Sequence, residues 1–204
     1  NGKVTTGMSH FLFRPFMTQY TRLDRKTRHA ADMYINVLEQ LGVTDVSNHG
    51  LHIETCKEWN DEVSRFYESQ GVMPHDKLIG FNIGSAVPEK RWPAERFADV
   101  ADYFADKGYK TVFFGGPMDL EMVKPVVEHM KTTPIVATGA FKIGSLAAAM
   151  KWCDLVITND SGPMHVAISQ GVPIVALYGP SNPFFYGPYQ AKSIVLESMD
   201  HYEI

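Results

Sequence analysis

Apolar residues recur at helical spacing in the first third of this chain of 204 residues. One run covers 30–41 and is stopped by Gly42, and a second covers 56–70 and is stopped by Gly71. Side chains three and four positions apart lie on one face of a helix, so each run predicts an amphipathic helix that buries a single stripe. The first part of the chain is therefore expected to be helical.

From Lys77 onward the pattern changes, because short apolar runs of strand length alternate with helical patterns and with turns rich in Gly, Pro, Asn and Ser. Repeated strand–helix units with right-handed crossovers build a parallel sheet with helices on both faces. The expected fold class is α/β, a doubly wound parallel sheet, with linker-like residues 74–76 dividing the chain into 1–75 and 76–204. The expected strands cover 78–83, 110–114, 134–137, 154–158, a run that ends in the Gly179 turn, and 193–196, and the expected helices of this part cover 93–107, 120–130, 145–152 and 164–170.

The stretch from Thr158 to His165 is the most informative part of the sequence. A strand runs there into a turn that opens a short helix; either Ser161 or Gly162 can cap this helix, and Pro163 suits its first position. Free N–H groups and the helix dipole favour an anion such as a diphosphate at this turn. The alternative is that the same residues form an ordinary strand, turn and helix with a polar cap and bind no ligand. A second Gly/Pro/Ser/Asn turn after the next strand favours the anion site, since two such turns line one crevice at the carboxyl edge of a sheet.

The loop after the first strand of the sheet adds positive charge. Gly84 and Ser85 leave room for a ligand beside the backbone, and Lys90 with Arg91 precedes a helix. A phosphate between Lys90 and the turn at 160–165 would have its charge neutralised and would receive N–H donors. The spacing matches neither a Walker P-loop nor the three-glycine fingerprint of dinucleotide-binding proteins.

Asp119 follows the second strand of the sheet, after the turn formed by Gly115, Gly116 and Pro117. An acidic residue in this place commonly accepts hydrogen bonds from ribose hydroxyls. The same residue can cap the following helix, and the sequence alone favours the cap.

Composition and charge mainly exclude functions. The 19 basic and 23 acidic residues give a net charge of −4, which is not the basic footprint of a nucleic-acid-binding protein. The sequence has no run of about 18 apolar residues, so no membrane span is expected. Cys56 and Cys153 are far apart, which is typical of a reducing cytosol and disfavours structural zinc. His49 and His52 could be a metal pair, but the sequence places no further ligand near them, so no metal is expected.

Several motifs occur in a fixed order in the second part of the chain: Lys90-Arg-Trp-Pro after Gly84-Ser85, a Phe-Gly-Gly-Pro turn, a Leu-Ala-Ala-Ala helix, Thr158 to His165, and the segment 171–181. Together they resemble glycosyltransferase family 9, the ADP-heptose:lipopolysaccharide heptosyltransferases, over residues 77–189. The resemblance implies the two-domain GT-B architecture, in which a C-terminal Rossmann-like domain binds a nucleotide-sugar donor. Residues 76–204 would be that domain, and 1–75 would be a partial, helical segment of the acceptor side with a linker.

The resemblance also implies roles for particular residues. Ser85 and Lys90 would contact the donor diphosphate, Asp119 would contact the adenosine ribose, and residues 141–143 would line the adenine pocket. Three residues, Lys90, Asp160 and His165, would be catalytic. The implied donor-binding positions are Gly84, Ser85, Lys90, Asp119, Phe141, Lys142, Ile143, Asp160, Ser161, Gly162 and His165.

The reaction implied by the resemblance is an inverting transfer of heptose from ADP-heptose, or a related nucleotide sugar, to a lipopolysaccharide core acceptor. It needs neither a metal nor another cofactor, because Lys90 and the helix N-terminus would stabilise the charge that develops on the departing ADP. The acceptor would be a lipid-linked glycan. The resemblance thus implies a cytoplasmic enzyme with at most peripheral contact at the inner face of the bacterial inner membrane.

One departure from the family pattern matters. In the family a complete N-terminal Rossmann domain, which begins with a Gly-Asp motif, supplies the general base and the acceptor site. The residues before Lys77 contain no Gly-Asp and none of the expected strands, so we expect the chain to be a fragment that could bind the donor without turning it over. Two alternatives remain open: a GT-B-like sugar-nucleotide epimerase and a non-catalytic nucleotide-binding module.

Overall fold

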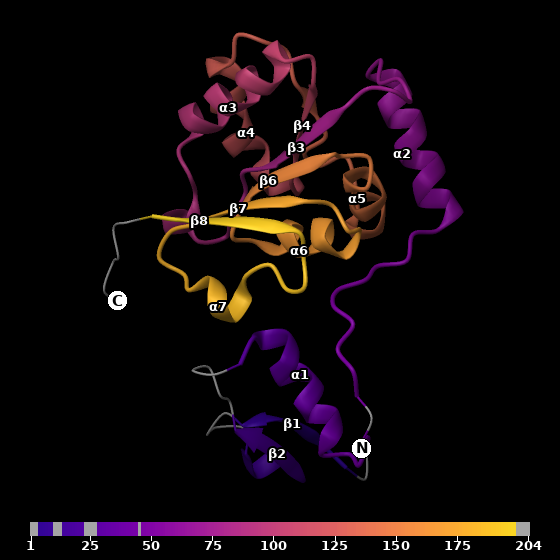
Figure 1. Cartoon of the computed structure of the whole chain (residues 1–204), viewed down its shortest axis with the longest axis vertical. Coiled ribbons are helices and arrows are strands. Elements are labelled where there is room, and N and C mark those ends of the chain that lie inside the picture. The colour runs from indigo at the N-terminus through magenta and orange to yellow at the C-terminus, as the bar shows by residue number, and fades with distance from the viewer. Residues whose placement is uncertain (1–3, 10–13, 23–27, 45, 199–204) are drawn as a thin grey trace.

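The computed structural model describes residues 4–9, 14–22, 28–44 and 46–198. Its main body is a six-stranded sheet in which all neighbouring strands run parallel (Figure 1). The order in the sheet is β5-β4-β3-β6-β7-β8, so the predicted doubly wound parallel sheet is confirmed. The strands are β3 (Leu78–Asn82), β4 (Lys110–Phe114), β5 (Ile135–Val136), β6 (Leu155–Asn159), β7 (Ile174–Tyr178) and β8 (Ser193–Glu197).

Helices cover both faces of this sheet. On one face, α3 (Ala94–Asp106) and α4 (Leu120–His129) pack over a core that contains Phe81 and Phe113. On the other face, α2 (Lys57–Ser69), α5 (Ile143–Met150) and α6 (Gly162–Ser169) pack over a second core. A four-residue α7 (Pro183–Tyr186) follows β7, and short 3-10 helices occupy Arg14–Phe16, Pro88–Lys90 and Pro117–Asp119. The predicted helices and strands agree with the observed ones to within two residues at each end.

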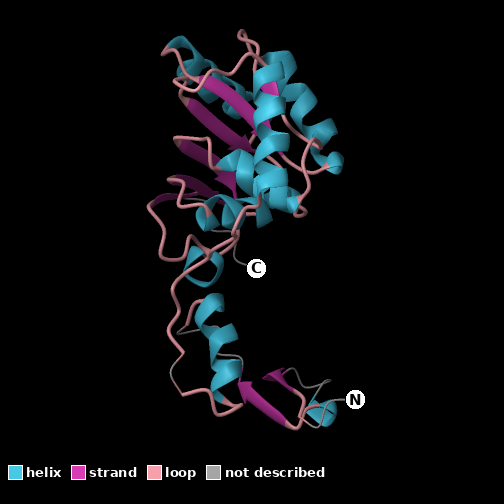
Figure 2. Cartoon of the chain, turned by 90° about the vertical axis from the view of Figure 1, so that its right-hand side faces the viewer, coloured by secondary structure: helices cyan, strands magenta, loops and turns pink. Residues whose placement is uncertain are grey.

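The predicted boundary at residue 75 does not follow the packing. Val63 and Tyr67 of α2 are fully buried in the core of the sheet body, and the Tyr67 hydroxyl donates to the carbonyl of Ala149 in α5 at 3.0 Å. By its contacts α2 therefore belongs to the sheet body, and the chain passes between its two parts over 46–55 (Figure 2). The stripe of an amphipathic helix shows that it packs but not what it packs against.

The N-terminal segment is not purely helical, so that expectation is wrong. Strand β1 (Thr6–Ser9) pairs in parallel with β2 (Gln19–Arg22), and α1 (Ala30–Glu39) lies beside both. Neither four-residue strand alternates apolar and polar residues, so the sequence carried no strand signal there. The assignment of this segment to the acceptor side of an enzyme stays a prediction.

The strand order creates a switch point between β3 and β6. From β3 the chain continues to α3 on one face of the sheet, and from β6 it continues to α6 on the opposite face. Two loops that leave neighbouring strands in opposite directions open a crevice at the carboxyl edge, which is where doubly wound proteins bind their ligands.

Candidate functional site

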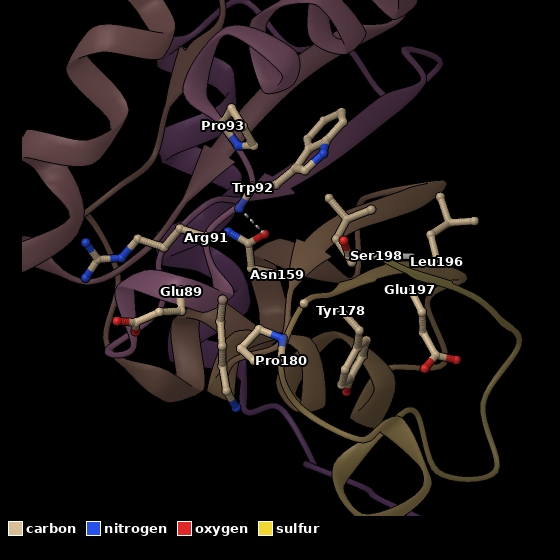
Figure 3. A pocket seen from close by; sticks show the side chains of 13 residues that line it. Glu89, Arg91, Trp92, Pro93, Asn159, Tyr178, Pro180, Leu196, Glu197 and Ser198 are labelled. Atoms are coloured by element: carbon tan, nitrogen blue, oxygen red, sulfur yellow. Dashed lines mark hydrogen bonds between the residues drawn. The ribbon is translucent and has the colours of Figure 1, made fainter. Parts of the chain in front are cut away.

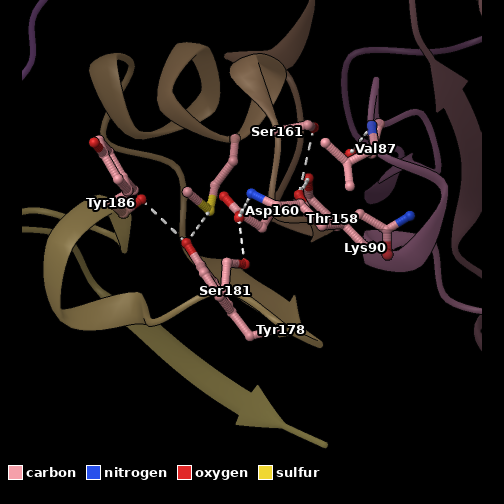
Figure 4. Close-up of polar contacts among 11 residues, drawn as sticks. Val87, Lys90, Thr158, Asp160, Ser161, Tyr178, Ser181 and Tyr186 are labelled. Carbon is pink, nitrogen blue, oxygen red and sulfur yellow. Dashed lines mark hydrogen bonds and ion pairs between the residues drawn. The ribbon is translucent and has the colours of Figure 1, made fainter. Parts of the chain in front are cut away.

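The loops after β3 and β6 are joined by an ion pair at the switch point (Figure 4). The side-chain nitrogen of Lys90 lies 2.5 Å from Oδ2 of Asp160, and the Ser181 hydroxyl donates to the same oxygen at 2.6 Å. The Asp160 side chain is 6% exposed and the Lys90 side chain is 24% exposed. The carboxylate is therefore enclosed, while the ammonium can still be reached from solvent by an anion.

Two buried asparagines hold the surrounding loops in place. Nδ2 of Asn82 donates to the Ser161 hydroxyl at 2.7 Å, which ties the end of β3 to the start of α6. Oδ1 of Asn159 accepts from the Trp92 backbone N–H at 3.1 Å, which ties the end of β6 to the loop after β3. Neither asparagine is among the predicted site residues, although an amide side chain at the end of an apolar strand is a usable signal.

The structure settles which residue caps α6 and which position Pro163 takes. Ser161 is the N-cap residue, and Pro163 takes the second helical position, so the expectation of the first position is off by one. The Ser161 side chain makes no capping hydrogen bond to the helix. Pro163 has no N–H, and the Met164 N–H donates to the Ser161 carbonyl at 3.1 Å. The Gly162 N–H has no side-chain cap and can donate to an anion.

A cavity of about 380 Å³ opens between these loops. The structure brings six of the predicted site residues to its wall and adds Tyr186, which sequence reasoning missed. Tyr186 comes from α7, and no local pattern in the sequence indicated that this short helix reaches the crevice. The lining residues are Ser85, Ala86, Val87, Lys90, Asp160, Ser161, Gly162, His165 and Tyr186.

His165 lies half-buried in the cavity wall, on the first turns of α6. Burial lowers the pKa of His165 below its ordinary value of 6.5; the negative charge of Asp160 acts against this shift, and His29 adds to it. The imidazole is therefore neutral near pH 7, so it can offer one donor and one acceptor but no full positive charge.

Asp119 is folded back onto the loops after β3 and β4. Its carboxylate accepts from the Gly116 N–H at 2.7 Å, and a Cβ added to Gly84 would lie 2.5 Å from its Oδ1. Gly115 in the same turn has φ 157°, which also favours glycine. Asp119 occupies the N-cap position of α4 without bonding to that helix, so it stabilises the preceding turn instead of capping the helix as the sequence favoured.

The structure does not bring residues 141–143 to the cavity. The ring of Phe141 packs edge-to-face on Phe66 of α2, with centroids 4.9 Å apart. Lys142 stands exposed at the N-cap of α5, and Ile143, the first residue of that helix, is 70% exposed. They share the carboxyl edge of the sheet with the Asp119 loop, because the N–H of Gly139 donates to the carbonyl of Gly115 at 2.9 Å.

A second cavity, of about 510 Å³, is bordered by the loop after β3 and by the ends of β7 and β8 (Figure 3). Its wall is formed by Trp92, Pro93, Tyr178, Leu196 and neighbouring residues. Among the predicted site residues only Lys90 borders it. The smaller cavity therefore holds the concentration of polar groups that the sequence analysis singled out.

Within the described ranges, no three His, Cys, Asp or Glu side chains group closely enough to hold a metal ion. His49 of the considered metal pair is exposed and shares a 2.6 Å hydrogen bond with Ser47. No helix among the described residues is long and apolar enough to cross a membrane.

The sequence is similar to curated bacterial heptosyltransferases. It is 35% identical over 130 residues to lipopolysaccharide heptosyltransferase 2 of Escherichia coli (strain K12), an alignment that covers 61% of this chain and 37% of that protein. It is 27% identical over 145 residues to lipooligosaccharide heptosyltransferase 2 of Haemophilus influenzae, covering 69% and 42% respectively. In these alignments the chain thus spans less than half the length of its curated relatives.

Solved structures agree with this relationship. A glycosyl transferase family 9 protein from Veillonella parvula DSM 2008 is 80% identical with a TM-score of 0.89, over 97% of this chain and 57% of that one. The ADP-heptose LPS heptosyltransferase II of E. coli is 26% identical with a TM-score of 0.81, over 95% and 61%.

Family membership rests on almost the whole chain. The sequence profile of glycosyltransferase family 9 (heptosyltransferase) matches residues 4–203, which extends the predicted resemblance to both sides of 77–189. The matched region includes the strand pair, the sheet body and both loops of the crevice. The chain therefore belongs to glycosyltransferase family 9, the heptosyltransferases.

Proposed function

We propose that this chain carries the donor site of an inverting, metal-independent heptosyltransferase that transfers heptose from ADP-heptose to a lipopolysaccharide core acceptor. The observation that carries the proposal is the Lys90–Asp160 pair beside the N-terminus of α6, in a family 9 protein. A related structure carries the description ADP-heptose LPS heptosyltransferase II, and that protein shares the fold over 95% of this chain.

The residues at the crevice suit a diphosphate. The Lys90 ammonium supplies positive charge, and the Gly162 N–H supplies a donor at the positive end of the α6 dipole. Ser85, 7% exposed, adds a hydroxyl from the loop after β3. A diphosphate bound here shares Lys90 with Asp160, so the site attracts the anion without neutralising it completely.

The reaction is a direct displacement at the anomeric carbon. The acceptor hydroxyl forms the new C–O bond as the bond to the β-phosphate oxygen breaks, and ADP leaves with the bonding electrons. Lys90 and the N-terminus of α6 lower the barrier because the charge on that oxygen is larger in the transition state than in the bound donor. Asp160 and neutral His165 are placed to bind and orient the transferred sugar.

The proton of the acceptor hydroxyl needs a base. Oδ2 of Asp160 already has two hydrogen-bond partners, Lys90 and Ser181. Family resemblance assigns the base to an Asp of the N-terminal Rossmann domain, so we propose that the described residues bind the donor and that the acceptor side completes the reaction. The site would then act in the cytoplasm, at the inner face of the membrane that holds the lipid-linked acceptor.

Asp119 and residues 141–143 are proposed to receive the nucleoside. Asp119 has a second carboxylate oxygen for ribose hydroxyls, and the exposed side chains of Met118 and Ile143, 91% and 70% exposed, offer apolar surface to a base.

Isothermal titration calorimetry with ADP, UDP and GDP tests the proposal. We expect ADP to bind more tightly than the other two, and ADP-heptose to bind at least as tightly as ADP. Equal affinities for ADP and UDP would contradict the heptosyltransferase assignment. A clear preference for ADP with no added affinity from the sugar would favour a non-catalytic nucleotide-binding module.

A further inference from the structure

The loop formed by residues 179–190 links the donor cavity to the N-terminal segment. At its first end, Ser181 donates to Asp160 at 2.6 Å. In its middle, Tyr186 lines the cavity, and its carbonyl accepts from the Tyr178 hydroxyl at 3.1 Å. At its far end, the ring of Tyr189 stacks on His29 with centroids 4.6 Å apart and an angle of 27° between the planes.

His29 stands just before α1 and uses both ring nitrogens. Nδ1 lies 3.1 Å from the Ala31 N–H, and Nε2 lies 3.1 Å from the buried carbonyl of Gly187. A backbone N–H only donates and a carbonyl only accepts, so Nδ1 must be bare and Nε2 must carry the proton. The same imidazole therefore caps α1 and holds the loop, in one fixed tautomer.

Tyr189 is also held through its hydroxyl group. Its hydroxyl donates to Oδ1 of Asp32 and accepts from Nδ2 of Asn48 at 2.9 Å, and this nitrogen also donates to Asp32 at 3.0 Å. The hydrogen bond to Asp32 raises the pKa of Tyr189, which keeps the phenol protonated as a donor. These contacts fix the far end of the loop against α1 and the connection that follows it.

We propose that His29 and Tyr189 form a clasp that positions the 179–190 loop as a wall of the donor cavity, which makes His29 a positioning residue for donor binding. The inference rests on the proposed donor site. Without the clasp, Tyr186 and Ser181 keep only the contacts made within the sheet body, and the cavity wall becomes mobile. The donor must then order that wall when it binds, which weakens its affinity.

Replacement of His29 by Asn separates this role from a purely structural one. Asn is among the best N-cap residues, so His29→Asn keeps the start of α1 but removes the stacking and the Nε2 bond to Gly187. We expect ADP to bind about three- to tenfold more weakly, with a thermal midpoint close to that of the unmutated chain. Tyr189→Phe, which keeps the ring, should retain more affinity than Tyr189→Ala. His49→Ala is the matched control, because that exposed imidazole bonds only to Ser47 among the described contacts and should leave ADP affinity unchanged.

Hydrogen exchange of the amides in 179–190, measured without nucleotide, tests the clasp independently of the proposed donor site. Faster exchange in His29→Asn together with weaker ADP binding would support the proposal. Unchanged exchange would overturn the clasp, and faster exchange with unchanged ADP affinity would overturn its positioning role. If the unmutated chain did not bind ADP, the donor site itself would fail, whereas the exchange rates would still report whether His29 holds the loop.

Discussion

The ammonium of Lys90 lies 2.5 Å from the carboxylate of Asp160, although the two residues are 70 positions apart in the sequence. The pairing is possible because β3 and β6 are neighbours in the sheet, so the loops that follow them meet at one edge. The Asp160 carboxylate is enclosed, whereas the Lys90 ammonium can be reached from solvent and can bind an anion. The carboxylate limits the net positive charge at the site. This balance of charge leads to the first two predictions.

Replacement of Lys90 by Ala should weaken the binding of ADP by about 1–3 kcal/mol, the range for losing charge-assisted hydrogen bonds. The change removes the positive charge and also leaves Asp160 facing the phosphates without its partner, and both effects disfavour the anion. Calorimetry with ADP measures the loss. Lys57→Ala is the control, since this exposed lysine pairs with Asp61 on α2, and it should bind ADP normally. Unchanged affinity in Lys90→Ala would move the site elsewhere.

Asp160 should discriminate between the nucleotide and the nucleotide sugar. Asp160→Ala is expected to weaken ADP-heptose binding by about 1–3 kcal/mol through lost hydrogen bonds. Asp160→Asn keeps the shape but removes a negative charge near the diphosphate, so it should weaken ADP less than it weakens ADP-heptose. Titration of both ligands into both variants checks this order. Equal losses for ADP and ADP-heptose would show that Asp160 does not contact the sugar.

Gly84 should not accept a side chain. A Cβ at this position would lie 2.5 Å from Oδ1 of Asp119, so Gly84→Ala must displace the carboxylate that organises the turn after β4. We expect Gly84→Ala to reduce ADP affinity at least several-fold, about 1 kcal/mol or more. The matched control is Gly116→Ala, where the added Cβ would meet Asp119 at an ordinary 3.8 Å. If Gly84→Ala and Gly116→Ala bound ADP with equal affinity, Asp119 would not contribute to nucleotide binding.

The sequence predicted the sheet body well because its signals are local. Each strand from β3 to β8 is a short apolar run, and α1, α2 and α3 end two or three residues before a glycine with positive φ, namely Gly42, Gly71 and Gly108. The meeting of Lys90 with the turn at 160–165 was also predictable, since it follows from strand order alone. That they form an ion pair was not predicted, because a motif gives the position of a charge but not its partner.

What the sequence did not predict depends on side chains far apart in the chain. His29 and Gly187 are 158 positions apart, and neither belongs to a motif that indicates a partner. The parallel pair β1 and β2 was missed because two four-residue strands have too few residues to show a period. Tyr186 was missed for a similar reason, since α7 has only four residues. The roles assigned to Asp119 and to residues 141–143 stay predictions.

The packing of α2 on the sheet body predicts a stability effect far from the cavity. The Tyr67 side chain is fully buried, and its hydroxyl donates to the Ala149 carbonyl at 3.0 Å. Tyr67→Phe should therefore lower the free energy of unfolding of the sheet body by about 1 kcal/mol, measured by urea denaturation. Tyr34→Phe, at a position 61% exposed on α1, should have little effect. If Tyr67→Phe were neutral, the hydrogen bond to the Ala149 carbonyl would not contribute measurably to stability.

His165 should make the stability of the chain depend on pH. Burial lowers its pKa in the folded chain below the ordinary 6.5, so as the pH falls the unfolded chain binds this proton first. The stability that neutral His165 contributes is fully present above about pH 6.5 and is lost as the pH falls toward the lower, folded pKa. Between about pH 7.5 and pH 5.5 we therefore expect the urea midpoint to fall less in His165→Gln than in the unmutated chain. His52→Gln removes an exposed imidazole and should keep the full pH dependence. If His165→Gln lost stability on acidification as steeply as His52→Gln, the depressed pKa would have to belong to another group.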